Sequence, residues 1–197
     1  MDMGMQIQGK KILISGGTSG IGFAVAKRKM GQGAQIVVSG RSRERGSVAV
    51  SELKELGDGF IHYVQGDAST AEGAQEVTRS AAQALGGLTT VISAGGGANL
   101  IGLKPFASYT TTELVDLLHS QVLPRILPVH AAIPYLREAG KGEIVMLTTD
   151  AARHATPGES MVGGDGAQIL MLTKVLAREL YRDQFRVNGV ELLITTI

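Results

Sequence analysis

A glycine-rich turn near the start of the chain has the residue types and spacing of a phosphate-binding site. Residues 12–22 read ILISGGTSGIG, in which an apolar run leads through glycines into a segment typical of a helix. The apolar run predicts a buried parallel strand, and free N–H groups at the start of the next helix attract anions. Gly16 permits the tight turn, Gly20 leaves room for a pyrophosphate, and Gly22 allows close packing of helix and strand. We predict that a dinucleotide binds Gly16, Thr18, Ser19, Gly20, Ile21 and Gly22.

The turn after the second predicted strand distinguishes between dinucleotides. Residues 34–39 read AQIVVS, and the next two residues are Gly40 and Arg41. A carboxylate at this point would accept hydrogen bonds from ribose hydroxyls, whereas a guanidinium pairs with a 2′-phosphate. Ser39 and Arg41, with Arg43 nearby, therefore favour NADP(H) over NAD(H) as the cofactor. A solvated charge at the start of a helix is the alternative interpretation of Arg41.

The whole chain alternates apolar, strand-like runs with helical segments. This alternation predicts right-handed crossovers and a Rossmann-like α/β fold, a doubly wound parallel sheet in three α/β/α layers. Residues 1–197 are expected to form a single domain. The long helix is expected to begin at a capping box and to be kinked or broken by its prolines. Strands are predicted at 12–14, 34–39, 60–64, 88–93, 143–148 and 186–192, and helices from Ile21 and at 42–56, 70–85, 110–138 and 164–182.

Polar or glycine-rich turns follow the predicted strands. In a doubly wound sheet, ligands bind beyond the carboxyl ends of the strands, near the point where the strand order switches. The turns after the third, fourth and fifth predicted strands are therefore expected to share one edge with the first glycine turn. Their residues are Asp67, Ala68, Ser93, Ala94, Gly95, Thr148 and Thr149.

The composition argues against several classes of function. A formal net charge of +1 on 197 residues and only 4% aromatic residues favour neither nucleic acid nor an anionic membrane as a partner. The absence of cysteine excludes disulfides and thiolate metal sites, and no cluster with metal-ligand spacing is predicted. No run reaches membrane-spanning length and the first residues do not resemble a secretion signal, so we expect a cytoplasmic protein.

Taken in order and at their spacing, these motifs resemble the short-chain dehydrogenase/reductase family over nearly the whole chain. The resemblance implies an oxidoreductase that binds a nicotinamide dinucleotide and a small-molecule carbonyl or alcohol. It also implies that Asp67 and Ala68 lie against the adenine, that Gly95 lies along the cofactor, and that two long helices form a homodimer or homotetramer. The residues that carry it are Ser15-Gly16-x3-Gly20-Ile21-Gly22, Gly40-Arg41, Asp67-Ala68, Ala94-Gly95 and Arg186-Val187-Asn188.

The groups that transfer protons in that family are replaced in this sequence. In an ungapped alignment, the tyrosine and lysine of the family's Tyr-x3-Lys pair fall on Val162 and Gly166. The family's serine falls on Thr149, its asparagine on Gln121, and its proline-glycine step on Leu192-Leu193. No tyrosine of this chain is followed by a lysine four residues later. Because a general acid contributes roughly 10²–10⁴ in rate, we expect weak activity or none.

Three hypotheses follow from the contrast between the retained phosphate-binding turns and the replaced proton-transfer groups. The first is an NADP(H)-binding sensor, scaffold or partner subunit whose usual catalysis is lost. The second is an active oxidoreductase in which Thr149 orients a carbonyl and His154 is the general acid, although an exposed loop histidine is the plainer interpretation. The third is a structural partner that binds no cofactor because Leu192-Leu193 plugs the pocket. Asp165 is expected in the first turn of the last helix, and the family's substrate lid is expected to be absent beyond Ile197.

Overall fold

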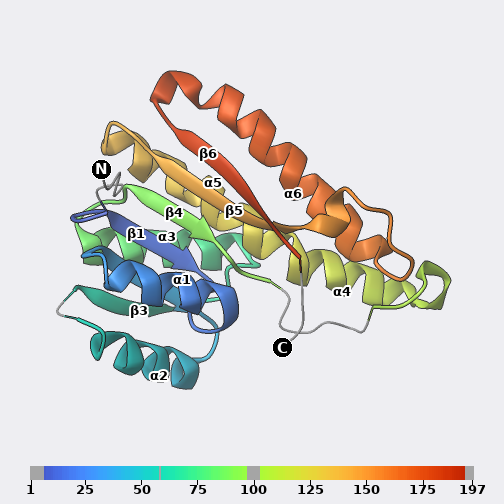
Figure 1. Cartoon of the computed structure of the whole chain (residues 1–197), viewed down its shortest axis with the longest axis horizontal. Helices are drawn as coiled ribbons and strands as arrows, with labels where there is room; N and C mark the ends of the chain where they lie inside the picture. Colours follow the sequence, from blue (N-terminus) through green and yellow to red (C-terminus); the bar gives the residue numbers. More distant parts are fainter. Residues whose placement is uncertain (1–6, 58, 97–102, 194–197) are drawn as a thin grey trace.

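The computed structural model describes residues 7–57, 59–96 and 103–193, and within them six strands form one parallel sheet (Figure 1). The strand order is β3-β2-β1-β4-β5-β6, so the chain starts in the middle of the sheet and the order switches between β1 and β4. This order confirms the predicted doubly wound α/β fold. The strands are β1 (Lys11–Ser15), β2 (Gln35–Gly40), β3 (Ile61–Gln65), β4 (Thr90–Ser93), β5 (Glu143–Thr149) and β6 (Arg186–Leu192).

Helices cover the two faces of this sheet (Figure 1). Successive residues of β1 point to opposite faces: Leu13 packs into one buried cluster with α3, α5 and α6, whereas Ile12 and Ile14 pack into another with α1 and α2. Three short 3-10 turns join the remaining elements. The helices are α1 (Gly20–Met30), α2 (Arg43–Lys54), α3 (Ala71–Leu85), α4 (Thr111–Gln121), α5 (Leu123–Glu138) and α6 (Ser160–Glu179), and the turns are η1 (Phe106–Ser108), η2 (Asp150–Ala152) and η3 (Tyr181–Asp183).

The long helix predicted at 110–138 is two helices. The break falls at Val122, because Pro124 has no N–H to donate and is accommodated in the first turn of α5. The predicted capping box is present: the Thr110 hydroxyl accepts from the Glu113 N–H at 3.2 Å, and the Glu113 carboxylate accepts from the Thr110 N–H at 2.7 Å. The break matters because it lets α4 and the start of α5 both contribute to one cleft.

The last helix begins four residues earlier than predicted, at Ser160, and includes three glycines in its first two turns. Glycine is unfavourable inside a helix by about 1 kcal/mol relative to alanine. Close packing compensates here, because a Cβ on Gly163 would lie 2.8 Å from the Ala151 carbonyl oxygen and one on Gly166 would lie 2.6 Å from Thr149 Cγ2. The start of α6 therefore lies directly against the end of β5.

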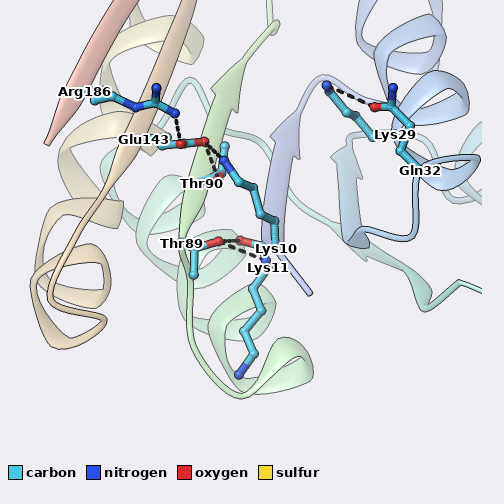
Figure 2. Close-up of polar contacts among 8 residues, drawn as sticks. All are labelled: Lys10, Lys11, Lys29, Gln32, Thr89, Thr90, Glu143 and Arg186. Atoms are coloured by element: carbon cyan, nitrogen blue, oxygen red, sulfur yellow. Dashed lines mark hydrogen bonds and ion pairs between the residues drawn. The ribbon is translucent and has the colours of Figure 1, made fainter. Parts of the chain in front are cut away.

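An ion network joins the amino ends of the strands, at the end of the sheet opposite the polar and glycine-rich turns that follow the strands. Glu143 accepts hydrogen bonds from Lys10 and Arg186, so one carboxylate links the segment before β1 to β5 and β6 (Figure 2). Partial burial raises the pKa of Glu143, but the bonds from Lys10 and Arg186 outweigh it and hold the pKa below its ordinary value. The amino ends of the strands thus have a structural role, and ligand binding is expected at their carboxyl ends.

Candidate functional site

A cleft of about 530 Å³ opens at the carboxyl ends of the strands, where β1 and β4 are neighbours. A volume of this size suits a small-molecule or cofactor site. The turns after β1, β2, β3 and β4 all contribute to its wall. Of the residues predicted to bind a dinucleotide, the structure places Gly16, Thr18, Ser19, Gly20, Ile21, Ser39, Arg41, Asp67, Ala68, Ala94 and Gly95 in its lining.

The two remaining predicted residues, Gly22 and Ser93, do not line the cleft but shape its wall. A Cβ on Gly22 would lie 2.3 Å from the Gly16 carbonyl oxygen, so only glycine lets α1 approach the turn so closely. The Ser93 hydroxyl is buried and donates to the Arg125 carbonyl oxygen at 2.8 Å. Gly16 has φ +76° and is packed against Gly95, which fixes the two glycine turns side by side.

The start of α1 presents unused polar groups. Ser19 is the N-cap residue of the helix, yet its side chain makes no capping hydrogen bond. Gly20 has open space around the position of a Cβ, and the neighbouring Ser15 hydroxyl is buried without a partner in the described part of the chain. Free N–H groups, the positive end of the helix dipole and unpaired hydroxyls together fit a pyrophosphate.

The turn after β2 brings two arginines to the cleft. Arg41 lines it, and its backbone is held from β3 because Gln65 Nε2 donates to the Arg41 carbonyl oxygen at 3.1 Å. Arg45, from the first turn of α2, lines it too, whereas Arg43 does not. From the sequence, Arg43 was named only as lying near Arg41, and Arg45 was not predicted. The signal for Arg45 is Ser42, whose hydroxyl caps the helix at the Arg45 N–H and so sets the phase of the first turn.

Asp67, at the end of β3, faces the same arginine-rich end of the cleft. Its Oδ1 accepts from the Ser69 hydroxyl at 2.6 Å and from the Ser69 N–H at 3.0 Å. The Ser69 hydroxyl is the largest cause that lowers the pKa of this carboxyl, and the charge of Arg41 lowers it further. One carboxylate oxygen is thus used within the protein, so Asp67 also stabilises its own turn.

The positions aligned with the family's tyrosine and lysine lie on α6 and carry no proton donor. Val162 is half-buried, and Gly166 is buried against Thr149 Cγ2. The Gly166 carbonyl oxygen accepts from the Thr148 hydroxyl at 2.8 Å, which holds α6 onto β5. A Cβ at 166 would lie 2.6 Å from Thr149 Cγ2, so a larger residue there requires that side chain to shift.

Thr149 and His154, the candidate substitute catalytic residues, are not among the residues that line the cleft. Thr149 Oγ1 accepts from the Ala151 N–H at 3.3 Å and so caps the turn η2. His154 is exposed beyond that turn. The structure does not bring either side chain to the cleft. Their catalytic roles stay predictions.

Asp165 does not lie in the first turn of the last helix, where it was expected. It lies in the second turn and is only 4% exposed, and its Oδ2 has no hydrogen-bond partner in the described part of the chain. Burial raises its pKa to about 6, although the positive charge of Arg125 opposes that shift. The rotation of α6 about its axis turns this residue inward. That rotation was not predicted from the sequence, because the helix was expected to start four residues later.

Further lining residues come from α4 and α5, whose residues were not predicted to bind the cofactor. Asp116, His119 and Ser120 share one face of α4 at helical spacing, and Arg125 follows from α5. His119 is exposed at the cleft. Gln121, at the family's asparagine position, is buried with its Nε2 unpartnered in the described residues. Residues 7–57, 59–96 and 103–193 contain no group of three side chains suited to hold a metal ion.

Comparison with known proteins identifies the class. The family model described as short chain dehydrogenase matches residues 10–196, and the chain belongs to the short-chain dehydrogenase/reductase family. This family of oxidoreductases binds nicotinamide dinucleotides and small-molecule substrates. The 1,6-dihydroxycyclohexa-2,4-diene-1-carboxylate dehydrogenase of Acinetobacter baylyi is 30% identical over 192 residues, which are 96% of this chain and 70% of that protein.

A second relative is similar in sequence, and two solved structures share the fold. The 2,5-dichloro-2,5-cyclohexadiene-1,4-diol dehydrogenase LinX of Sphingobium indicum is 28% identical over 95% of this chain and 74% of its own. A short-chain type dehydrogenase/reductase from Mycobacterium ulcerans shares the fold, with a TM-score of 0.89 at 24% identity over 95% of this chain and 68% of its own. NAD+-bound xylitol dehydrogenase also has a TM-score of 0.89, at 22% identity over 94% of this chain and 70% of its own.

None of the helices in the described residues combines the length and the apolar character that crossing a bilayer requires.

Proposed function

We propose that this chain binds NADP(H), in preference to NAD(H), in the cleft at the carboxyl ends of its strands. The observation that carries the proposal is the pair of guanidinium groups, Arg41 and Arg45, in the cleft wall where β2 ends. β2 ends in Gly40 without a carboxylate, so nothing at that turn repels a 2′-phosphate. Arginine suits this role because its planar fork pairs with phosphate oxygens in two hydrogen bonds at once.

The described residues fit a dinucleotide. The glycine turn before α1 would hold the pyrophosphate through its backbone N–H groups, and the unpaired Ser15 hydroxyl lies in the same wall. Asp67 and Ala68 would contact the adenine, and Gly95 would lie along the rest of the cofactor. When bound, the nicotinamide supplies hydride transfer, and the chain supplies binding and orientation.

We further propose that reduction or oxidation through the family's usual groups is very weak or absent. Val162 and Gly166 cannot donate a proton, and Thr149 has its hydroxyl engaged at the turn η2. The protein would then bind its cofactor as a sensor, scaffold or partner subunit. A purely structural role without a cofactor is disfavoured, because Leu192 lines the cleft and yet leaves it open and rich in arginine.

Titration calorimetry with NADPH and NADH tests the cofactor proposal. The double variant Arg41→Ala/Arg45→Ala should weaken NADPH binding roughly 10- to 100-fold, the value of one or two charge-assisted hydrogen bonds, while NADH binding changes little. Arg43→Ala is the matched control, because this arginine belongs to the same turn but lies outside the cleft. Equal affinities for NADPH and NADH would contradict the preference, and no binding of either at millimolar concentration would contradict the proposal.

An active oxidoreductase with substitute acid/base groups is the second candidate. The relatives named for diol and dihydroxy-diene substrates favour cyclic alcohols and ketones as the first compounds to assay. Turnover of NADPH that disappears in His154→Ala would support it. Turnover that persists unchanged in that variant would show that the proton comes from elsewhere.

We also propose a homo-oligomer formed through α4 and α6. Both helices expose large apolar side chains, Val115 and Leu118 on α4 and Met171 and Val175 on α6, each at least 39% exposed. Light scattering after size exclusion measures the mass directly. Met171→Glu should shift an oligomer toward monomer, and a wild-type monomer at micromolar concentration would contradict this part of the proposal.

A further inference from the structure

Arg125 is the arginine at the end of the cleft away from Arg41. Arg41 follows β2 and Arg125 lies beside the turn after β4, with β1 between these two strands in the sheet. Arg125 Nε donates to the Gly95 carbonyl oxygen at 3.1 Å, and the Arg125 carbonyl oxygen accepts from the Ser93 hydroxyl at 2.8 Å. Both its backbone and its guanidinium are therefore attached to the end of β4.

Most of the hydrogen-bonding capacity of this guanidinium is unused within the described residues. The bond to Gly95 uses one of its five N–H groups, and residues 7–57, 59–96 and 103–193 provide no other hydrogen bond and no ion pair to it. The buried carboxyl of Asp165 acts on it through charge alone, without direct contact in this part of the chain. Since Arg125 lines the cleft, the N–H groups that find no partner in the described residues can reach a ligand there.

The chain offers no cation from α6 at this end. Gly166 has no side chain, and a Cβ there would lie 2.6 Å from Thr149 Cγ2, 3.2 Å from Ala152 Cβ and 3.2 Å from Thr148 Oγ1. The basic side chains of α6 are Lys174 and Arg178, which lie two turns or more further along the helix and do not line the cleft. The positive charge at this end therefore comes from α5.

We propose that Arg125 supplies, from α5, the cation that α6 lacks, and that its free guanidinium N–H groups hold the nicotinamide-ribose half of NADP(H). This inference rests on the proposed function. A planar fork with several donors suits neighbouring oxygens, such as the two hydroxyls of a ribose or the oxygens of the adjoining phosphate. No tyrosine stands among the residues that line the cleft, so this cation positions the ligand without activating a proton donor.

The test compares a whole ligand with a fragment. NADPH occupies both halves of the proposed site, whereas adenosine 2′,5′-bisphosphate occupies only the half at Arg41 and Arg45. Arg125→Met keeps the apolar stem of the side chain and removes the fork. It should weaken NADPH binding roughly 10- to 100-fold and leave bisphosphate binding within about twofold of wild type. Arg125→Lys keeps the charge but not the fork, so its affinity for NADPH should lie between those of the wild type and Arg125→Met.

The fragment also reports on folding, since a variant that binds the bisphosphate normally is folded. Unchanged NADPH affinity in Arg125→Met would overturn this inference and leave the proposed function standing. Equal loss of both ligands would also overturn it, because the effect would not belong to the nicotinamide half. If wild-type protein binds neither ligand, the proposed function fails and this inference fails with it.

Discussion

In the turn before α1, glycine leaves room for a ligand, whereas at the start of α6 it leaves room for the protein itself. Gly20 lines the cleft with nothing within 4 Å of a Cβ position, but Gly166 is packed onto the end of β5. The first region keeps unpaired N–H and hydroxyl groups at the surface of the cleft. In the second, a Cβ on Gly166 would lie 2.6 Å from Thr149 Cγ2, and the Thr148 hydroxyl donates to the Gly166 carbonyl oxygen.

The proposed function thus assigns binding and catalysis to separable parts of one fold. The phosphate end depends mainly on backbone groups, which a chain keeps as long as its turns keep their conformation. The catalytic end depends on particular side chains, and single substitutions remove them. A chain can therefore retain a cofactor site and lose its chemistry, and the predictions below separate the two regions.

The largest effect is expected for Gly22→Ala, in the binding region. Alanine normally stabilises a helix by about 1 kcal/mol over glycine, but here its Cβ would lie 2.3 Å from a backbone oxygen that has no room to move. We expect a loss of about 2–4 kcal/mol in the free energy of unfolding, measured with urea, and loss of NADPH binding. Gly164→Ala on α6, where a Cβ meets open space, is the control and should be neutral or stabilising.

Asp165→Asn tests the buried carboxyl in the second turn of α6. The folded-state pKa is about 6 and the unfolded value is near 4, so the folded state holds this proton more tightly. Its contribution to stability is full below pH 4 and is lost as the pH rises toward 6. At pH 7–8 the variant should therefore be more stable than wild type by about 2–3 kcal/mol, and at pH 4 the two should be alike. Parallel stability curves from pH 4 to 8 would contradict a raised pKa.

Gly166→Ala tests whether the protein has closed the lysine position. The added methyl would lie 2.6 Å from Thr149 Cγ2, a side-chain atom that can shift, so we expect a loss of about 1–2 kcal/mol in the free energy of unfolding. Affinity for adenosine 2′,5′-bisphosphate should be unchanged, because that ligand belongs to the other end of the cleft. A stabilised variant would show that α6 has room there.

The smallest effect is expected at the opposite edge of the sheet, with Glu143→Gln. This change removes a charge that pairs with Lys10 and Arg186 (Figure 2), in a partly exposed position where such pairs contribute about 1 kcal/mol or less. The pKa of Glu143 is held low, so its contribution is present at neutral pH and is lost as the pH falls through that pKa. Thermal unfolding at pH 7 measures the loss, while NADPH affinity should stay at the wild-type value.

Much of the fold and of the lining of the cleft was predictable because both depend on local signals. The alternation of strand and helix reports burial on two faces, and the φ of +76° at Gly16 reports a backbone need that glycine meets best. The capping box at Thr110 and the break at Pro124 are likewise set by residues a few positions apart. Such features require no knowledge of which distant segments meet.

Contacts between distant segments were decided only by the tertiary structure. Arg45 rather than Arg43 lines the cleft because the phase of α2 follows from its cap, and Arg125 lines it because α5 packs beside the end of β4. Asp165 is buried because it lies in the second turn of α6, on the part of the helix that packs on β5. Composition and periodicity establish which segments form helices and strands, but the rotation of each helix about its axis depends on packing against partners far away in the chain. That rotation determines which charges face the cleft.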